Sequence, residues 1–310
     1  MIVTPFAKRV VLLNCAVPAI LLAWDAVQHR LGANPVNLAI RTTGMLTIIF
    51  LLLSLTVTPL IRLFSLSWLG TFRRSMGVSA FAYAAIHLGL YFFFDRAANV
   101  VDAIMEIGLR KYLLIGIIGF LILLPLAATS TDGMIRKLGA KRWKRLHLLA
   151  YVAAIAGVLH FYLLVKADTT RPLIAMGLLG LLFAYRIVAH QRKLHGELKQ
   201  LRSASVAPQA ANESVTTTTS PASTEATLEF AHSGRQLREL NGRTILELAE
   251  ANGISIPYDC RAAVCGQCKT RVLSGNVVMD ADDALDVTDR ANGVVLACQA
   301  RCRDAVVVDR

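Results

Sequence analysis

Six long apolar segments occupy the first two-thirds of this chain, at approximately residues 10–28, 40–61, 75–94, 111–129, 146–165 and 172–190. Each is close to the ~20 residues that an α-helix needs to cross the hydrocarbon core of a bilayer. The 310 residues are 55% hydrophobic and only 17% charged, which is too apolar for an ordinary soluble protein and too weakly charged for a disordered one. Although Lys8 and Arg9 precede the first segment as in a signal peptide, five further segments follow it, which favours a retained helix. We therefore expect a bundle of six membrane-spanning helices.

The charges divide the chain into two parts of different character. Residues 1–202 carry 23 basic and 7 acidic residues, a net charge of +16, whereas residues 203–310 carry 10 and 14, a net charge of −4. Sixteen of these basic residues lie on one side of the expected membrane, in or near the N-terminal tail, the second and fourth connections and the exit from the sixth segment. Seven lie on the other side. Because basic loops remain in the cytoplasm, we expect both termini there. Membrane topology explains this charge better than nucleic-acid binding does, since the basic half is also the apolar half.

Three histidines lie within the expected spans: His87 in the third, and His147 and His160 in the fifth. His87 follows Arg74 by 13 residues and His160 follows His147 by 13 residues, and such a stretch of helix rises about 20 Å. We therefore expect His87 and His160 at similar depth in the outer half, with His147 near the inner surface. Two histidines at equal depth on neighbouring helices can bind a haem iron from both faces. Ionisable residues inside a membrane are functional candidates, so we expect all three to be haem axial ligands.

Two alternatives remain for these histidines. They could be buried side chains that are hydrogen-bonded to polar neighbours and bind no metal. The partner opposite His147 is also open, because Arg73 and Arg74 occupy the matching depth on the third span. His190 and His195, at the inner end of the sixth span, are more typical of solvated end residues.

Five of the six cysteines follow residue 259, which indicates one local site instead of a distributed disulfide framework. Cys260, Cys265 and Cys268 have the C-x4-C-x2-C spacing, and Cys298 follows after 29 residues. This is the spacing of a plant-type [2Fe–2S] cluster, in which four thiolates bind two irons. Structural zinc sites more often pair two C-x2-C units, and disulfides are disfavoured in the reducing cytoplasm. Cys302 could compete as the fourth ligand.

A polar segment separates the membrane half from the cysteine-rich part. Residues 203–225 are rich in Ser, Thr, Ala and Pro, and we expect them to form a flexible linker. Residues 226–310 predict a compact α+β domain. The stretches ATLEF, RQLREL, VVLAC and AVVVD predict strands, while Thr244 and Glu247 form a capping box for a helix that Gly253 ends.

The stretch CRAAVCGQCKTRVLSG followed by VVLACQARC resembles the ferredoxin domains that are fused to oxygenase reductases, and this resemblance covers the whole C-terminal domain. It implies the β-grasp fold and favours Cys298 over Cys302 as the fourth ligand. One position departs from the pattern: Ala263 stands where these domains usually have glycine. Glycine there permits unrestricted φ, so alanine is expected to shift the potential or loosen the loop without abolishing the cluster.

The membrane half resembles a second family. The stretches TGMLTIIFLLLSLTVTPLIRL (43–63), FRRSMGVSAFAYAAIHLGLYFFFD (72–95) and LAATSTDGMIRKLGAKRWKRLHLLAYVAAIAGVLHFYLLVK (126–166) are similar to the MsrQ family, within the ferric-reductase-like transmembrane superfamily. This resemblance implies one or two b-type haems in a bacterial inner membrane, with His87, His147 and His160 on the family's histidine positions. It also implies electron delivery to a periplasmic molybdenum-containing methionine sulfoxide reductase subunit. Flavin mononucleotide is a further candidate cofactor and quinone a further candidate partner, neither with assigned residues.

The chain contains no G-x-G-x-x-G after a strand and no P-loop, so we expect a cytoplasmic flavin reductase or similar donor to supply the electrons. The expected architecture is a multi-domain protein with an all-α haem-binding bundle (1–202), a linker (203–225) and an α+β ferredoxin-like domain (226–310). The expected function is a membrane electron-transfer subunit whose catalytic sulfoxide chemistry takes place on its partner. The alternative is a self-sufficient quinol- or ferredoxin-linked cytochrome b that reduces a small acceptor such as a ferric chelate. A transporter with a ferredoxin-like sensor is disfavoured because the spans hold few charges.

Overall fold

The computed structural model describes the chain except for residues 1–4, 65, 207–225 and 239. Within the described residues, six segments are long and apolar enough to cross a membrane, as expected from the sequence. They comprise α1 (Pro5–Val27), α2 (Pro35–Phe64), α3 (Arg73–Leu90) with its flanking turns η1 (Ser67–Phe72) and η2 (Tyr91–Asp95), α5 (Lys111–Ala128), the pair α7 (Ala140–His147) and α8 (Leu149–Leu164), and α9 (Thr170–Val206). The predicted spans coincide with these segments apart from their ends.

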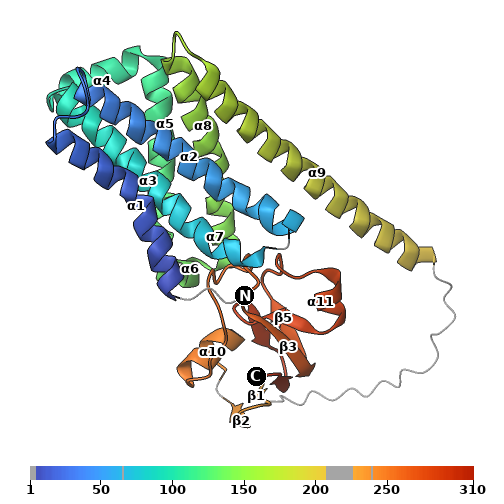
Figure 1. Ribbon diagram of the computed structural model, residues 1–310. Coiled ribbons are helices and arrows are strands. Elements are labelled where there is room, and N and C mark those ends of the chain that lie inside the picture. Colours follow the sequence, from blue (N-terminus) through green and yellow to red (C-terminus); the bar gives the residue numbers. More distant parts are fainter. Residues whose placement is uncertain (1–4, 65, 207–225, 239) are drawn as a thin grey trace, which may run out of the picture.

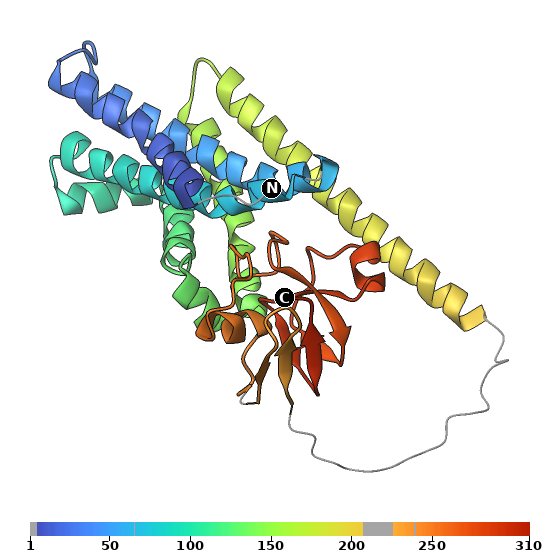
Figure 2. The same ribbon diagram turned by 60° about the horizontal axis from the view of Figure 1, so that its bottom comes forward.

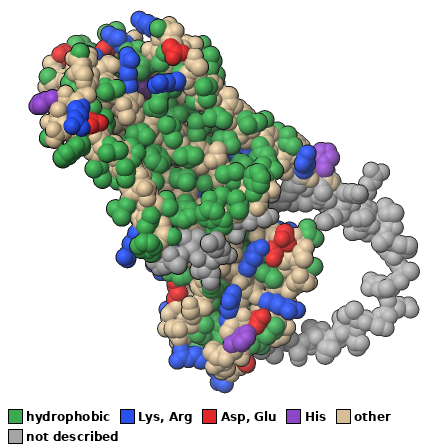
Figure 3. All heavy atoms as spheres, in the orientation of Figure 1, with side chains coloured by type: hydrophobic (Ala, Val, Ile, Leu, Met, Phe, Trp, Pro, Cys, Tyr) green, Lys and Arg blue, Asp and Glu red, His purple; other side chains and the backbone are tan. Residues whose placement is uncertain are grey.

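Small residues allow the helices of the bundle to approach one another. Ala80 on α3 and Ala153 and Ala154 on α8 are almost fully buried beside Leu55 of α2. Large apolar side chains such as Leu181, which is 68% exposed, instead cover the outside. Figure 3 shows this apolar surface over the membrane half, with charged side chains gathered at its ends. Such a surface is suited to lipid and not to water.

Two short helices were not anticipated. α4 (Val100–Leu109) lies between the third and fourth spans, and α6 (Asp132–Leu138) precedes α7 in the basic stretch that the sequence suggested to be a loop. Asn99 caps α4 and Thr131 caps α6, each by accepting a backbone N–H with its side-chain oxygen. The sixth helix also differs from expectation: α9 continues to Val206, so the first four residues assigned to the linker are helical. The remainder of the predicted linker, 207–225, lies outside the described residues.

A small network closes the end of the bundle opposite the C-terminal domain. The carboxylate of Glu106 on α4 pairs with Arg96 and with Arg110, both at 2.8 Å. It also accepts a hydrogen bond of 3.0 Å from the Tyr91 hydroxyl. Since Glu106 is largely buried, these partners satisfy a charge that would otherwise be costly there.

The C-terminal domain has a five-stranded mixed sheet in the order β2-β1-β7-β3-β5. The strands are β1 (Leu228–Phe230), β2 (Arg235–Leu237), β3 (Lys269–Ser274), β5 (Val294–Leu296) and β7 (Val306–Val308). β1 is parallel to β7, and the other neighbours are antiparallel. β4 (Val277–Met279) and β6 (Ala300–Cys302) form a separate antiparallel pair, and α11 (Val287–Ala291) precedes β5.

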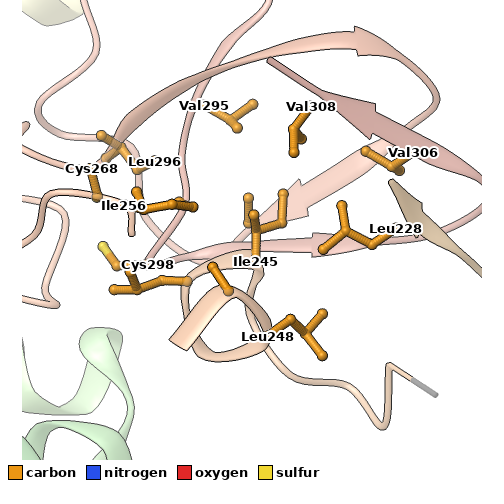
Figure 4. Close-up of a cluster of buried hydrophobic side chains, with 14 of the residues drawn as sticks. Leu228, Ile245, Leu248, Ile256, Cys268, Val295, Leu296, Cys298, Val306 and Val308 are labelled. Atoms are coloured by element: carbon orange, nitrogen blue, oxygen red, sulfur yellow. The ribbon is translucent and has the colours of Figure 1, made fainter. Parts of the chain in front are cut away.

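Helix α10 (Ile245–Ala251) packs on the sheet and completes the core of this domain. The capping box predicted at Thr244 and Glu247 is present at its start, and Gly253 follows its end with φ of +72°. Ile245 and Leu248 of α10 point toward Leu228 and Val308 of the sheet (Figure 4). A mixed sheet closed over one helix is the β-grasp arrangement expected from the sequence.

The C-terminal domain lies against one end of the helical bundle. Figures 1 and 2 both place it beside α6, α7 and the start of α3, while α9 extends away from the bundle toward the same side. The helices that carry six basic residues (Arg136, Lys137, Lys141, Arg142, Lys144 and Arg145) therefore lie beside the C-terminal domain.

Candidate metal-binding centres

The loop between α10 and β3 carries three of the four predicted cysteine ligands. Cys260, Cys265 and Cys268 lie on this loop, and Cys298 lies directly after β5. The backbone N–H of Ala297 donates to the carbonyl oxygen of Cys268 at 3.0 Å, which fixes the end of β5 beside the loop. The fold therefore brings the four predicted ligands to one edge of the domain core.

The four sulfurs are arranged as two pairs. The thiols of Cys260 and Cys265 are in hydrogen-bonding contact, and so are those of Cys268 and Cys298. A tetrahedral zinc ion needs four ligands around one centre, whereas a [2Fe–2S] cluster needs two thiolates at each iron. The paired donor set fits the iron–sulfur cluster.

Backbone amides surround the Cys260 sulfur. The N–H groups of Ala262 and Val264 point to it at 3.4 Å, and that of Cys265 at 3.3 Å. The Cys265 thiol and these amides lower the pKa of Cys260 to about 6, against the effect of burial. Thiolates are the form that binds iron, and these amides would stabilise negative charge at the Cys260 sulfur.

Positive φ angles aim these amides inward. Ala263 has φ of +60° and is almost fully buried. This is the position at which the sequence departs from the usual glycine, and the backbone keeps the left-handed conformation despite the methyl group. Cys302, the competing candidate, lies on β6 opposite Val277, and burial raises its pKa to about 11. The structure therefore groups Cys298, and not Cys302, with the other three cysteines.

The bundle brings His87 and His160 together, as their equal depth predicted. Their ring centroids are 6.2 Å apart. The Nδ1 atom of His87 lies 2.9 Å from the carbonyl oxygen of Ile40 on α2, and that of His160 lies 2.7 Å from the carbonyl oxygen of Tyr112 on α5. A carbonyl oxygen can only accept, so both Nδ1 atoms carry the proton and both Nε2 atoms offer a lone pair. Metal-binding histidines are commonly oriented in this way.

Two glycines provide the space that these imidazoles occupy. A Cβ atom on Gly44 of α2 would lie 3.1 Å from the His87 ring, and one on Gly116 of α5 would lie 2.8 Å from Nδ1 of His160. A metal held at about 2 Å from each of two imidazole nitrogens separates the ring centroids by about 6 Å. The separation, the ring orientation and the space together fit a pair of axial ligands to one haem. The sequence alone does not identify these glycines, because their role depends on contacts between helices that place them beside His87 and His160.

His147 has a different environment. Its ring stacks on Trp143 with centroids 3.8 Å apart, and its Nδ1 atom contacts the carbonyl oxygen of Trp143 at 3.1 Å. Nε2 lies 3.4 Å from the Ser130 hydroxyl. No second histidine faces it among the described residues, since His190 and His195 are exposed on α9. The positive charge of Arg73, at the start of α3, acts electrostatically on His147.

Comparison with known proteins divides the chain at the same boundary as the structure. Residues 42–158 match a family described as the ferric reductase like transmembrane component. Residues 229–303 match the 2Fe-2S iron-sulfur cluster binding domain. The four cysteines lie inside the second match, and His87 and His147 lie inside the first.

Several relatives align with the membrane half over most of their own length. A protein from Rhodospirillum rubrum called "Protein-methionine-sulfoxide reductase heme-binding subunit MsrQ" is 44% identical over 191 residues, which are 59% of this chain and 88% of the relative. Proteins of the same name from Herminiimonas arsenicoxydans and Caulobacter vibrioides are 36% and 39% identical, over 58% and 56% of this chain and 84% and 83% of their own.

One similar solved structure is that of Pseudomonas putida NdmA with the ferredoxin domain of NdmD. It is 28% identical, covers 27% of this chain and 98% of that chain, and has a TM-score of 0.25.

Proposed function

Because the chain belongs to the MsrQ family, we propose that it passes electrons from a cytoplasmic donor to a periplasmic methionine sulfoxide reductase catalytic subunit. The relatives are named as haem-binding subunits of such a system. The added C-terminal domain supplies a second redox group. When bound, a [2Fe–2S] cluster and a haem each exchange one electron at a time. The sulfoxide chemistry takes place on the partner, and the donor is a cytoplasmic flavin reductase or a similar protein.

One observation carries this proposal: the chain holds two separate donor sets at different levels. Two pairs of cysteine sulfurs lie against one end of the bundle. His87 and His160 face each other near the other end, beside the first turns of α2 and α5. We assign the cysteines to the cluster and this histidine pair to a b-type haem. We further propose that His147 contributes to a second haem near the cytoplasmic surface, which would bridge the two levels.

The number of haems can be measured directly. Detergent-purified full-length protein is assayed for haem and iron–sulfur content by reduced optical spectra and low-temperature electron paramagnetic resonance. Two haems and one cluster per chain support the role of His147. One haem and one cluster assign His87 and His160 as its ligands and remove His147 from the path, leaving it for flavin mononucleotide or quinone. A chain without haem contradicts the proposed function.

Electron entry through the cluster is tested by Cys265→Ser, with Cys302→Ser as the matched control. Cys265 lies in the paired set, whereas Cys302 is separate from it on β6. We expect Cys265→Ser to abolish the cluster signal and lower the rate of haem reduction by NADH and a flavin reductase at least tenfold. Dithionite should still reduce the haem, and Cys302→Ser should behave as the unsubstituted protein.

Haem reduction at an unchanged rate in Cys265→Ser would show that electrons bypass the cluster. Rapid reduction of a ferric chelate by the chain alone, with no transfer to a periplasmic methionine sulfoxide reductase, would favour the self-sufficient cytochrome instead.

A further inference from the structure

We propose that the membrane half is itself the docking partner of the C-terminal domain, and that Gly70 is the point at which the cysteine loop is seated. This inference rests on the proposed function, because it assumes that the two halves exchange electrons. It goes beyond that function by naming the surface at which they meet. The alternative occupants of the domain's cysteine edge are a second copy of the chain and a separate soluble protein.

One tight contact between the two halves involves a glycine. Gly70 lies in η1, at the cytoplasmic end of α3, and a Cβ atom on it would lie 3.2 Å from Cβ and 3.3 Å from Cα of Cys265. Ile61 of α2 closes the other side at 3.4 Å. Any larger residue would therefore press on the backbone of the cysteine loop, which cannot move aside without disturbing the sulfurs.

Charged pairs flank this contact on two sides. Lys8 at the start of α1 pairs with Asp259, the residue before the first cysteine ligand. Lys144 on α7 pairs with Asp283. The cysteine edge of the domain is therefore held from α1 on one side and from α7 on the other, with Gly70 between them.

The junction continues along α6 and α7. A small cavity of about 50 Å³ is lined by Arg136 and Gly139 of the membrane half and by Cys298 and Gln299 of the domain. Figure 4 shows Cys268 and Cys298 on one side of the domain core, the side that faces the helices in pale green. The charge of Arg73 also acts on the Cys260 sulfur. Arg73 therefore interacts electrostatically both with the cysteine loop and with His147 of the membrane half.

Each contact is individually weak. The four side chains of the two ion pairs are between 14% and 49% exposed, and such partly exposed pairs contribute little and weaken with salt. Since both halves belong to one chain, however, docking is an intramolecular event with an effective concentration in the millimolar range. Weak pairs then suffice for a populated docked state, and the domain can still separate to meet a donor.

The docking surface is tested with a reagent that joins Lys and Asp side chains in direct contact. Full-length protein in detergent is treated with a water-soluble carbodiimide, and the joined peptides are identified by mass spectrometry. We expect Lys8–Asp259 and Lys144–Asp283 products. Mixing isotopically labelled with unlabelled protein separates joining within one chain from joining between two copies.

Gly70→Leu and Gly77→Leu provide the matched comparison. A Cβ on Gly77, on α3, meets nothing within 4 Å, so a leucine there faces open space. We expect Gly70→Leu to reduce both products at least fivefold, because its side chain pushes the cysteine loop away without touching the reacting groups. Gly77→Leu should leave them unchanged. Optical spectra show whether haem and cluster are retained in both variants.

An exchange of charges provides a second test in case Gly70→Leu does not fold. Lys144→Asp combined with Asp283→Lys should restore the product that either single change removes. Products between two copies, absent products, or equal yields from the two glycine variants would overturn the docking proposal. Because the assay measures contact and not turnover, joined products with no haem reduction would refute the proposed function alone, and haem reduction without them would refute docking alone.

Discussion

Ala263 holds a left-handed backbone conformation inside the cysteine loop, at φ of +60° and with almost no exposed surface. Alanine already bears the roughly 1–2 kcal/mol that this conformation costs an L-residue, and added methyl groups at a packed site cost about 1–3 kcal/mol more. We expect Ala263→Val to destabilise the loop by about 1–3 kcal/mol and to lower the cluster content per chain several-fold. Iron and sulfide analysis with the visible absorption of the cluster measures this.

Ala263→Gly is the control for this substitution. Relief of backbone strain is offset by the lost methyl burial of about 0.8 kcal/mol and by the backbone freedom of glycine, about 0.5–1 kcal/mol. The glycine variant should therefore keep its cluster. If the valine variant bound a cluster as fully as the glycine variant, the strained loop would be unimportant for assembly.

The cysteine ligands could be predicted from sequence because their spacing is itself the constraint: three must fit one tight loop and the fourth a neighbouring strand end. The separation of Cys298 from Cys302 needed more than spacing, since both follow β5 closely. It depends on β6, which pairs with β4 and carries Cys302 away from the other three sulfurs. Gly70 could not be found from sequence, because its importance comes only from the approach of Cys265.

The contact between α5 and α8 depends on Gly116, where the His160 imidazole fills the place of a side chain. A Cβ there would lie 2.8 Å from Nδ1 of His160, which is closer than side chains pack. We expect Gly116→Ala to displace His160, to break its hydrogen bond to Tyr112 and to lower haem content by about one haem per chain. Pyridine haemochrome assays on purified protein measure the change.

Gly157→Ala on α8 is the matched control, because a Cβ at Gly157 meets nothing within 4 Å. It adds the same methyl group to the same pair of helices and should leave haem content unchanged. Equal haem content in the Gly116 and Gly157 variants would remove His160 from the haem site.

The long apolar helices were predictable, whereas the short helices between them were not. A span of ~20 apolar residues has few alternatives in a membrane, because every backbone group must be hydrogen-bonded internally. α6 and α7 are instead short and rich in charged residues, so they contain too few apolar residues to show a helical repeat. The interruption at Leu148, between α7 and α8, also has no sequence signal.

The sequence bears on the arrangement of the two halves only through their opposite net charges. The sequence separates a basic half from an acidic one, and four acidic residues lie close together in the domain. In the structure Asp280 pairs with Arg301, Asp282 pairs with Arg290 and Asp286 caps α11. Among the described residues, Asp283 is the one of these four that pairs with the membrane half, through Lys144. Net charge alone left open whether the acidic segment meets a separate basic protein, the membrane half or only solvent, and the particular pairs followed from the fold of each half.

The orientation of the whole molecule follows from the same charges and can be tested with single cysteines. Ala98, between η2 and α4, and Gly133, on α6, are exposed at opposite ends of the bundle. Since basic segments stay in the cytoplasm, the α6–α7 end should face inward together with the docked domain. An impermeant maleimide should therefore label Ala98→Cys in spheroplasts and Gly133→Cys only in inverted membrane vesicles. The unsubstituted chain measures the background from Cys15 and Cys302. The reverse pattern would place the cysteine-rich domain outside the cell, where no cytoplasmic flavin reductase could reach it, and would refute the proposed direction of electron flow.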